Sequence, residues 1–217
     1  MILTPEQLHE KKQNHSLRVA FVGMSNVGKS FRAREMAKFD KFFQVSVDDL
    51  IAEGMQLKNM SALANWMGYP YEENFEEHVK EYLQHEKKFT TNIDLSLNKN
   101  IVLDTTGSVV YLPSEAQEFV KNNFLVINLE LPAAMKDKMI DHFFAHPKPV
   151  VWGESFDLQE GEDKKEALRR CYPDLLAWRE EKYREMADVS VNFFEDTSWV
   201  GYREFWRRLE GSLSEEA

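Results

Sequence analysis

The sequence has one cysteine, no long apolar run and no excess of positive charge. Cys171 has no second cysteine with which to form a disulfide inside the chain, and such sparing use suits a reducing compartment. No apolar stretch is long enough to cross a bilayer, and residues 1–15 lack the apolar core of a signal peptide. We therefore expect a soluble, cytoplasmic protein that has no membrane partner.

The charge balance argues against a second class of partner. The 217 residues contain 37 Asp and Glu against 27 Lys and Arg, which gives a formal net charge of −10. A phosphate backbone is normally met by a net basic face, so we expect no nucleic-acid partner. The length suits one α/β domain with a sizeable core, and we expect a monomer.

Short apolar runs alternate with helical patterns along most of the chain. Strands are predicted at 18–22, 42–47, 101–104, 124–130 and 189–193. Helices are predicted at 29–38, at 58–87 with a break near 68–70, at 114–122, 132–145 and 164–187, and after the fifth strand. The alternation predicts an α/β fold whose five-stranded parallel sheet is covered by helices on both faces.

Local signals mark the starts of two helices. The stretch TPEQ at 4–7 predicts a capping box and a short helix at 4–13, inside an N-terminal extension that covers residues 1–16. Ser114 with Gln117 predicts a second capping box.

Residues 19–33, VAFVGMSNVGKSFRA, have the spacing of a phosphate-binding loop between a strand and a helix. Glycines permit the backbone angles of a tight loop whose amides point at a phosphate chain, and the N-terminus of the helix favours an anion. Lys29 is placed to reach the outer phosphates, and the Ser30 hydroxyl to coordinate Mg²⁺. The predicted nucleotide-binding residues are Gly23, Ser25, Asn26, Val27, Gly28, Lys29, Ser30 and Phe31.

Two classes of protein share such a loop. A GTPase-type switch is favoured by NVGKS and by DTTG at 104–107, which fits an Asp-x-x-Gly motif after an apolar strand. However, the later strands do not end in the Asn-Lys-x-Asp that usually gives guanine specificity. The long helical segment between the loop and Asp104 also fits a small-molecule kinase better than a switch. We therefore favour ATP, and keep the switch and an ATP-binding protein without kinase activity as alternatives.

Further motifs follow the loop in a specific order. VSVDDLIAE at 45–53 ends a strand with acidic residues, and TGS at 106–108 follows another strand. KPVV at 148–151 precedes the acidic segment, and LLAWREEKYREMADVSV at 175–191 leads into the last strand. In this order, over residues 17–210, the chain resembles the shikimate kinase family of P-loop small-molecule kinases.

The resemblance assigns individual positions. Asp48 matches the second aspartate of the family's strand-end Asp-x-Asp, and Ser46 stands where the first would be. Gly107 and Ser108 lie in the place of the family's triple glycine. Arg179 matches the arginine of its Leu-Leu-x-x-Arg segment, and Lys148 stands for the arginine of its lid motif.

The resemblance also implies an organisation. We expect a three-layer α/β/α P-loop kinase domain over 17–212, with a substrate-binding helical segment at about 55–90 and a lid at about 146–163. Composition alone leaves the acidic segment equally consistent with a solvated loop. The tail at 213–217 is expected to be frayed. The implied reaction is Mg²⁺-dependent transfer of the γ-phosphate of ATP to a hydroxyl of a small molecule.

Phosphoryl transfer depends on positioning and charge neutralisation, and the chain offers a group for each part of that chemistry. The expected catalytic residues are Lys29, Asp48 as acceptor of the hydroxyl proton, and Lys148 as closing cation, with His146 as an alternative to Lys148. Ser30 and Asp104 are the expected Mg²⁺ ligands, Asp104 in the manner of a Walker B carboxylate. A turn or helix cap without a metal is the alternative for Asp104.

The acceptor side departs from the family pattern. Its expected residues are Asp48, Glu73, Gly107, Ser108 and Arg179. The family holds its substrate's carboxylate with an arginine in Gly-x-x-x-Phe-Arg, and the match to GYPYEENFEEHV at 68–79 puts Glu72 and Glu73 at the Phe-Arg pair. Facing carboxylates repel, so we expect an acceptor other than shikimate, either a neutral polyol or a molecule with a cationic group. A solvated helix face is the alternative for Glu73.

Overall fold

A computed structural model describes residues 3–145, 149–196 and 198–216 of the chain. Five parallel strands form the central sheet, in the spatial order β2-β3-β1-β4-β5. They are β1 Arg18–Val22, β2 Phe43–Ser46, β3 Ile101–Asp104, β4 Leu125–Leu129 and β5 Val189–Val191. The chain fills one side of β1 first and then the other, so the sheet has a topological switch point at β1.

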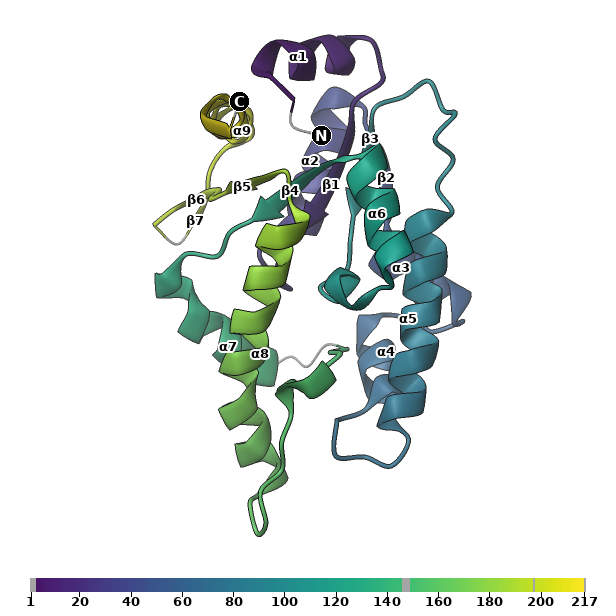
Figure 1. Cartoon of the computed structure of the whole chain (residues 1–217), viewed down its shortest axis with the longest axis vertical. Helices are drawn as coiled ribbons and strands as arrows, with labels where there is room; N and C mark the ends of the chain where they lie inside the picture. Colours follow the sequence, from purple (N-terminus) through teal and green to yellow (C-terminus); the bar gives the residue numbers. More distant parts are fainter. Residues whose placement is uncertain (1–2, 146–148, 197, 217) are drawn as a thin grey trace.

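Helices connect the strands and cover both faces of the sheet. They are α1 Pro5–Gln13, α2 Lys29–Asp40, α3 Val47–Gly54, α4 Met60–Met67, α5 Phe75–Thr91, α6 Ser114–Asn123, α7 Lys136–Ala145, α8 Lys164–Met186 and α9 Tyr202–Glu216. In Figure 1, α2 lies behind the sheet, and α6 and α8 lie in front of it. This is the expected α/β/α architecture. Within the described ranges, no helix is long and apolar enough to cross a membrane.

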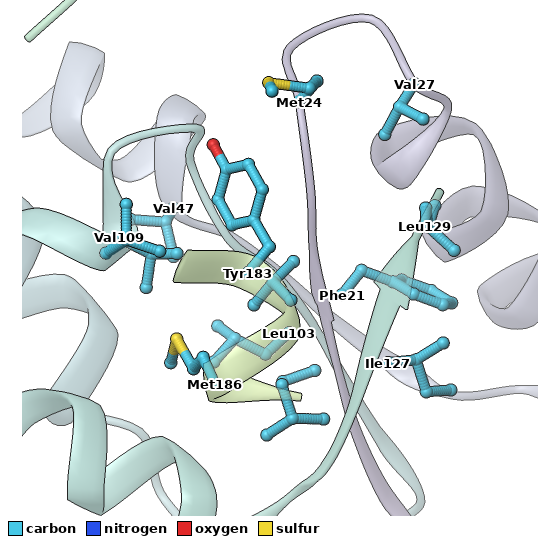
Figure 2. Packing of buried hydrophobic residues seen from close by; sticks show 14 of the residues in the cluster. Phe21, Met24, Val27, Val47, Leu103, Val109, Ile127, Leu129, Tyr183 and Met186 are labelled. Atoms are coloured by element: carbon cyan, nitrogen blue, oxygen red, sulfur yellow. The ribbon is translucent and has the colours of Figure 1, made fainter. Parts of the chain in front are cut away.

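The core lies on both sides of the central strands. β1, β3 and β4 are buried almost throughout, as expected for parallel strands with both faces covered. Figure 2 shows Tyr183 and Met186 of α8 beside Leu103, and Phe21 and Ile127 together on the other side of the strands.

The predicted break near 68–70 in the helical stretch at 58–87 is confirmed, because α4 and α5 are separate helices and Gly68 ends α4 with a φ of +75°. The predicted strand at 42–47 ends at Ser46, and the unpredicted helix α3 begins directly after it. Val47 and Ile51, one helical turn apart, are both buried, so this short apolar run packs as a helix.

The chain ends and caps were predicted only in part. The Thr4 capping box is confirmed, because Thr4 and Gln7 exchange both side-chain-to-backbone hydrogen bonds. The Ser114 capping box is wrong: Pro113 is the N-cap of α6, and the Gln117 side chain donates to backbone carbonyls before the helix. α9 continues to Glu216, through most of the tail that was expected to be frayed.

Asp40, at the end of α2, joins the two terminal helices to the domain. Its carboxylate accepts hydrogen bonds from the Tyr202 hydroxyl and from Trp206 Nε1, the latter at 3.1 Å, both on α9. Lys12 Nζ of α1 lies 2.7 Å from the same oxygen and 4.0 Å from the centre of the Trp206 ring. The N-terminal extension is therefore packed against the domain through Asp40 and α9.

Replacing Asp40 tests this arrangement. Asp40→Ala leaves the Tyr202 hydroxyl and the Trp206 indole without their acceptor, so the free energy of unfolding is expected to fall by about 1–3 kcal/mol. Urea denaturation measures it, with Asp141→Ala at an exposed position of α7 as the matched control. An equal effect of the two substitutions would contradict the role given to Asp40.

Candidate active site

The carboxyl ends of three neighbouring strands meet at one edge of the sheet. In the parallel register, Phe21 of β1 and Ser46 of β2 both lie beside Asp104, the last residue of β3. The loop after β1, the start of α3 and the Asp104 side chain are therefore neighbours. Ligands of open α/β sheets bind at this edge, next to the switch point.

The loop after β1 has the backbone geometry of an anion-binding loop. Gly23 and Gly28 have φ values of +136° and +107°, which favour glycine. A Cβ on Gly23 would lie 2.9 Å from the carbonyl oxygen of Leu129, so the loop also packs too closely there for a side chain. α2 begins at Lys29, directly after the loop, and directs its N-terminus toward it.

Lys29 holds the loop closed. Its Nζ donates hydrogen bonds of 2.8 Å to the carbonyl oxygen of Gly23 and of 2.9 Å to that of Met24. The side chain is buried, with 7% of its surface exposed. The ammonium group is thus positioned over the loop by the loop's own carbonyls.

A cavity of about 620 Å³ opens above the loop. Six of the expected nucleotide-binding residues line it, together with Asp48 and Gly107, and these six are Ser25, Asn26, Gly28, Lys29, Ser30 and Phe31. Gly23 and Val27 do not line it, and Val27 belongs to the core. Three cationic or titratable side chains that the sequence did not indicate also reach the cavity: Arg34, Lys138 and His142.

Trp199 forms one wall of this cavity. The hairpin of β6 Phe194–Glu195 and β7 Ser198–Trp199 carries it. Its ring stacks on Phe31, with the centroids 4.6 Å apart, and its indole nitrogen lies 2.9 Å from where a Cβ on Gly28 would be. The residue is 42% exposed, its ring faces the loop, and it lies before the start of α9 at Tyr202.

Asp104 and Ser30 come together beside Lys29. The Ser30 hydroxyl lies close enough to the Asp104 carboxyl group to influence its pKa. Burial raises the pKa of Asp104, while Lys29, Ser30 and Arg34 act in the opposite direction. A hydroxyl and a carboxylate are the oxygen ligands that Mg²⁺ prefers, and Mg²⁺ usually takes its remaining ligands from water and phosphate. This donor set fits the ion, although no group of three His, Cys, Asp or Glu with metal-site geometry occurs among the described residues.

Asp48 lies at the junction of this large cavity with another, narrow cavity. We call the narrow cavity the neck. Asp48 is half-buried in the first turn of α3 and lines both spaces. The neck has a volume of about 30 Å³. Gly107, Ser108 and Arg179 also line it, so four of the five expected acceptor-binding residues lie together.

Glu86 of α5 is a buried carboxyl that the sequence analysis missed. Its two oxygens accept hydrogen bonds from Thr106 Oγ1 at 2.5 Å and from Ser108 Oγ at 2.6 Å. Burial raises the pKa of Glu86 to about 7; the two hydroxyls oppose this shift, and Asp48 adds to it. Tyr82, Glu86 and Thr90 are four residues apart and all buried, and this helical spacing was the available signal.

Arg179 of α8 reaches the neck from the opposite side. Its Nη2 donates to the carbonyl oxygen of Val151 at 2.6 Å, and its guanidinium lies 5.2 Å from the Tyr111 ring centre. Its Nε is buried and has no hydrogen-bond partner. The Tyr183 hydroxyl donates to the carbonyl oxygen of Gly107, which ties α8 to the turn that carries Ser108.

One expected acceptor residue, Glu73, is not brought to this edge. It is exposed, lies in the turn before α5 and lines none of the cavities described here. Lys148 and His146 lie outside the described residues. Of the expected lid, the later part is held to α8, because Arg170 binds Glu162 at 2.8 Å.

Solved structures match this fold over nearly the whole chain. Shikimate kinase from Acinetobacter baumannii, in complex with shikimate, is 19% identical, with a TM-score of 0.63 and coverage of 94% of this chain and 98% of that one. The shikimate kinase from Bacteroides thetaiotaomicron is 17% identical (TM-score 0.51, coverage 92% and 95%), and that from Aquifex aeolicus 14% (TM-score 0.52, coverage 91% and 96%). No protein-family model matches the sequence, and curated proteins give no significant match. The chain therefore has a shikimate kinase-like P-loop kinase fold.

The raised pKa of Glu86 predicts a pH-dependent stability. Between about pH 4.5 and pH 7 the folded protein keeps a proton on Glu86 that the unfolded chain releases, so this carboxyl lowers stability as the pH rises through that window. Glu86→Gln removes the titration. The free energy of unfolding of the variant minus that of wild type should therefore increase by about 2–3 kcal/mol from about pH 5 to about pH 8. Urea unfolding at both pH values measures this gain, and parallel curves for the two proteins would contradict the assignment.

Proposed function

We propose that this protein is a kinase that transfers the γ-phosphoryl group of ATP, with Mg²⁺, to a hydroxyl of a small molecule. The observation that carries the proposal is the single cavity at the strand ends, which Lys29, Ser30 and Asp48 line together, with Asp104 beside Ser30 and Lys29. The shikimate kinase-like fold supports the same reaction class.

The loop is the phosphate-binding part of the proposed site. Its residues Ser25 to Ser30 and the N-terminus of α2 would hold the phosphates, and Lys29 would exchange the carbonyl oxygens of Gly23 and Met24 for phosphate oxygens. Phe31 and Trp199, on the cavity wall, would contact the base. When bound, Mg²⁺ would neutralise phosphate charge from Ser30 and Asp104.

Asp48 is the proposed partner of the acceptor hydroxyl. The hydroxyl gives its proton to Asp48 as its oxygen bonds to the γ-phosphorus, and the bond from that phosphorus to the bridging oxygen breaks and releases ADP. Lys148, or His146 in its place, remains the proposed closing cation on the resemblance alone. Gly107, Ser108 and Arg179 are the proposed contacts of the acceptor, since they share the neck with Asp48.

Separating ATP binding from transfer tests this division of roles. Lys29→Ala is expected to weaken ATP binding, whereas Asp48→Asn should leave ATP affinity within about twofold and lower acceptor-dependent ADP formation by about 10²–10⁴-fold. Tryptophan fluorescence follows binding, because Trp199 faces the cavity. ADP formation is assayed with shikimate, sugars, polyols and nucleosides as acceptors.

The controls for this experiment are the neighbouring Asp49→Asn and the exposed Lys38→Ala on α2. Both should behave as wild type. Hydrolysis that needs no acceptor and prefers GTP would instead identify the switch, and tight ATP binding without transfer to any acceptor would identify a nucleotide-binding protein without kinase activity.

The metal role of Asp104 has its own test. Asp104→Asn keeps the shape of the side chain and removes its charge, so the Mg²⁺ concentration needed for half-maximal turnover should rise at least about tenfold. A Mg²⁺ titration of ADP formation measures it, and EDTA should stop the wild-type reaction. An unchanged Mg²⁺ dependence in the variant would leave Asp104 with a purely structural role.

A further inference from the structure

A second large cavity lies beyond the neck. It has a volume of about 550 Å³ and is bounded by α4, the following loop and the stretch around Val150 and Trp152. It shares Met60, Phe143 and Val150 with the neck, and it shares no lining residue with the loop cavity. The three spaces therefore form a series, with Asp48 between the nucleotide side and the second cavity.

The neck limits what can reach Asp48 from the second cavity. Its volume of about 30 Å³ is close to that of one or two water-sized groups. Arg179 and Ser108 bound it and are themselves fixed, Arg179 by the carbonyl oxygen of Val151 and Ser108 by the Glu86 carboxyl. A hydroxymethyl group fits a space of this size and can extend further through it than a hydroxyl attached directly to a ring.

The second cavity carries one charged side chain among its described lining residues, and that charge is negative. Glu72 Oε2 accepts a hydrogen bond of 3.1 Å from the backbone N–H of Tyr69. The carboxylate also lies against Gly68, where a Cβ would come within 2.1 Å of Oε2, so a side chain at position 68 would displace it. This hydrogen bond orients the exposed Glu72 side chain at the cavity, and the polar groups of Ser61 and Asn65 line the same cavity.

Aromatic side chains complete a setting that favours a cation. Tyr69 and Trp152 line the cavity together with Phe143. Positive groups bind favourably to aromatic faces, whereas an anion would be repelled both by the faces of these rings and by the Glu72 carboxylate. The charge of Arg179 lies in the neck, where its Nη2 is already bonded to Val151.

We propose that the second cavity binds the body of the acceptor, and that the acceptor is a primary alcohol with a positively charged group. Its hydroxymethyl group passes through the neck to Asp48, while its cationic body lies against Glu72. This assignment rests on the proposed kinase function and specifies the substrate class of that site.

Four small molecules of similar size test both parts of the proposal. D-Glucosamine, D-glucose and D-gluconate each have a primary hydroxyl and differ in charge, and inositol has only ring hydroxyls. Dissociation constants come from the shifts of the Ser61, Asn65 and Tyr69 amide signals in nuclear magnetic resonance spectra. Glucosamine should bind roughly tenfold more tightly than gluconate, and glucose should support more ADP formation than inositol.

Two neighbouring glutamates provide the matched variants. Glu72→Gln keeps the acceptor oxygen for the Tyr69 N–H and removes the charge, so it should abolish the preference for glucosamine over gluconate. Glu73→Gln, at an exposed position outside the cavity, should preserve that preference. ATP affinity should be the same in both variants as in wild type.

The outcomes separate this inference from the proposed function. Equal or tighter binding of gluconate, an equal loss in the two variants, equal ADP formation with inositol and glucose, or no shift of the three amides with any compound would each overturn the inference. Selective binding of glucosamine that never leads to ADP would support the cavity assignment and overturn the kinase function instead.

Discussion

The parallel register of β2, β3 and β1 is the constraint on which the site depends. Because Ser46, Asp104 and Phe21 lie side by side, the elements that follow these strands begin at the same edge of the sheet. The phosphate-binding loop, the first turn of α3 and the Asp104 carboxyl are thereby brought together at one place. A slip of one residue in β3 would turn Asp104 to the other face of the sheet.

Two buried carboxyl groups near this edge have different surroundings, and we assign them different roles. Burial raises the pKa of Asp104, but Lys29 and the Ser30 hydroxyl beside it favour the ionised form, as would a bound metal ion. Glu86 is buried against two hydroxyls and faces the charge of Asp48, and its pKa is raised to about 7. We infer that Glu86 positions the turn from Thr106 to Ser108. In the proposed reaction, Asp104 acts at the phosphates and Asp48 acts on the acceptor.

The sequence was sufficient for the parts of the site that are local in the chain. Loop spacing located Lys29 and Ser30, and the strand ends located Asp48 and Asp104, because each of these depends on one loop or one strand. Residues whose place depends on distant packing were missed. Glu86 lies in a helix whose exposed face is also rich in glutamate, and Trp199 reaches the loop from a hairpin that no turn signal marked. Glu72 and Glu73 are adjacent in sequence and both exposed, and only the three-dimensional structure shows that Glu72 lines the second cavity and Glu73 does not.

The central claim is that the cavity at the strand ends transfers phosphate to an alcohol. The most direct measurement follows radiolabelled γ-phosphate of ATP in a single turnover with Mg²⁺ and the alcohols named above. The account predicts that the label appears in a phosphate ester of an alcohol, in step with the release of ADP. Label that remains in the nucleotide, or that appears only as inorganic phosphate, would contradict it.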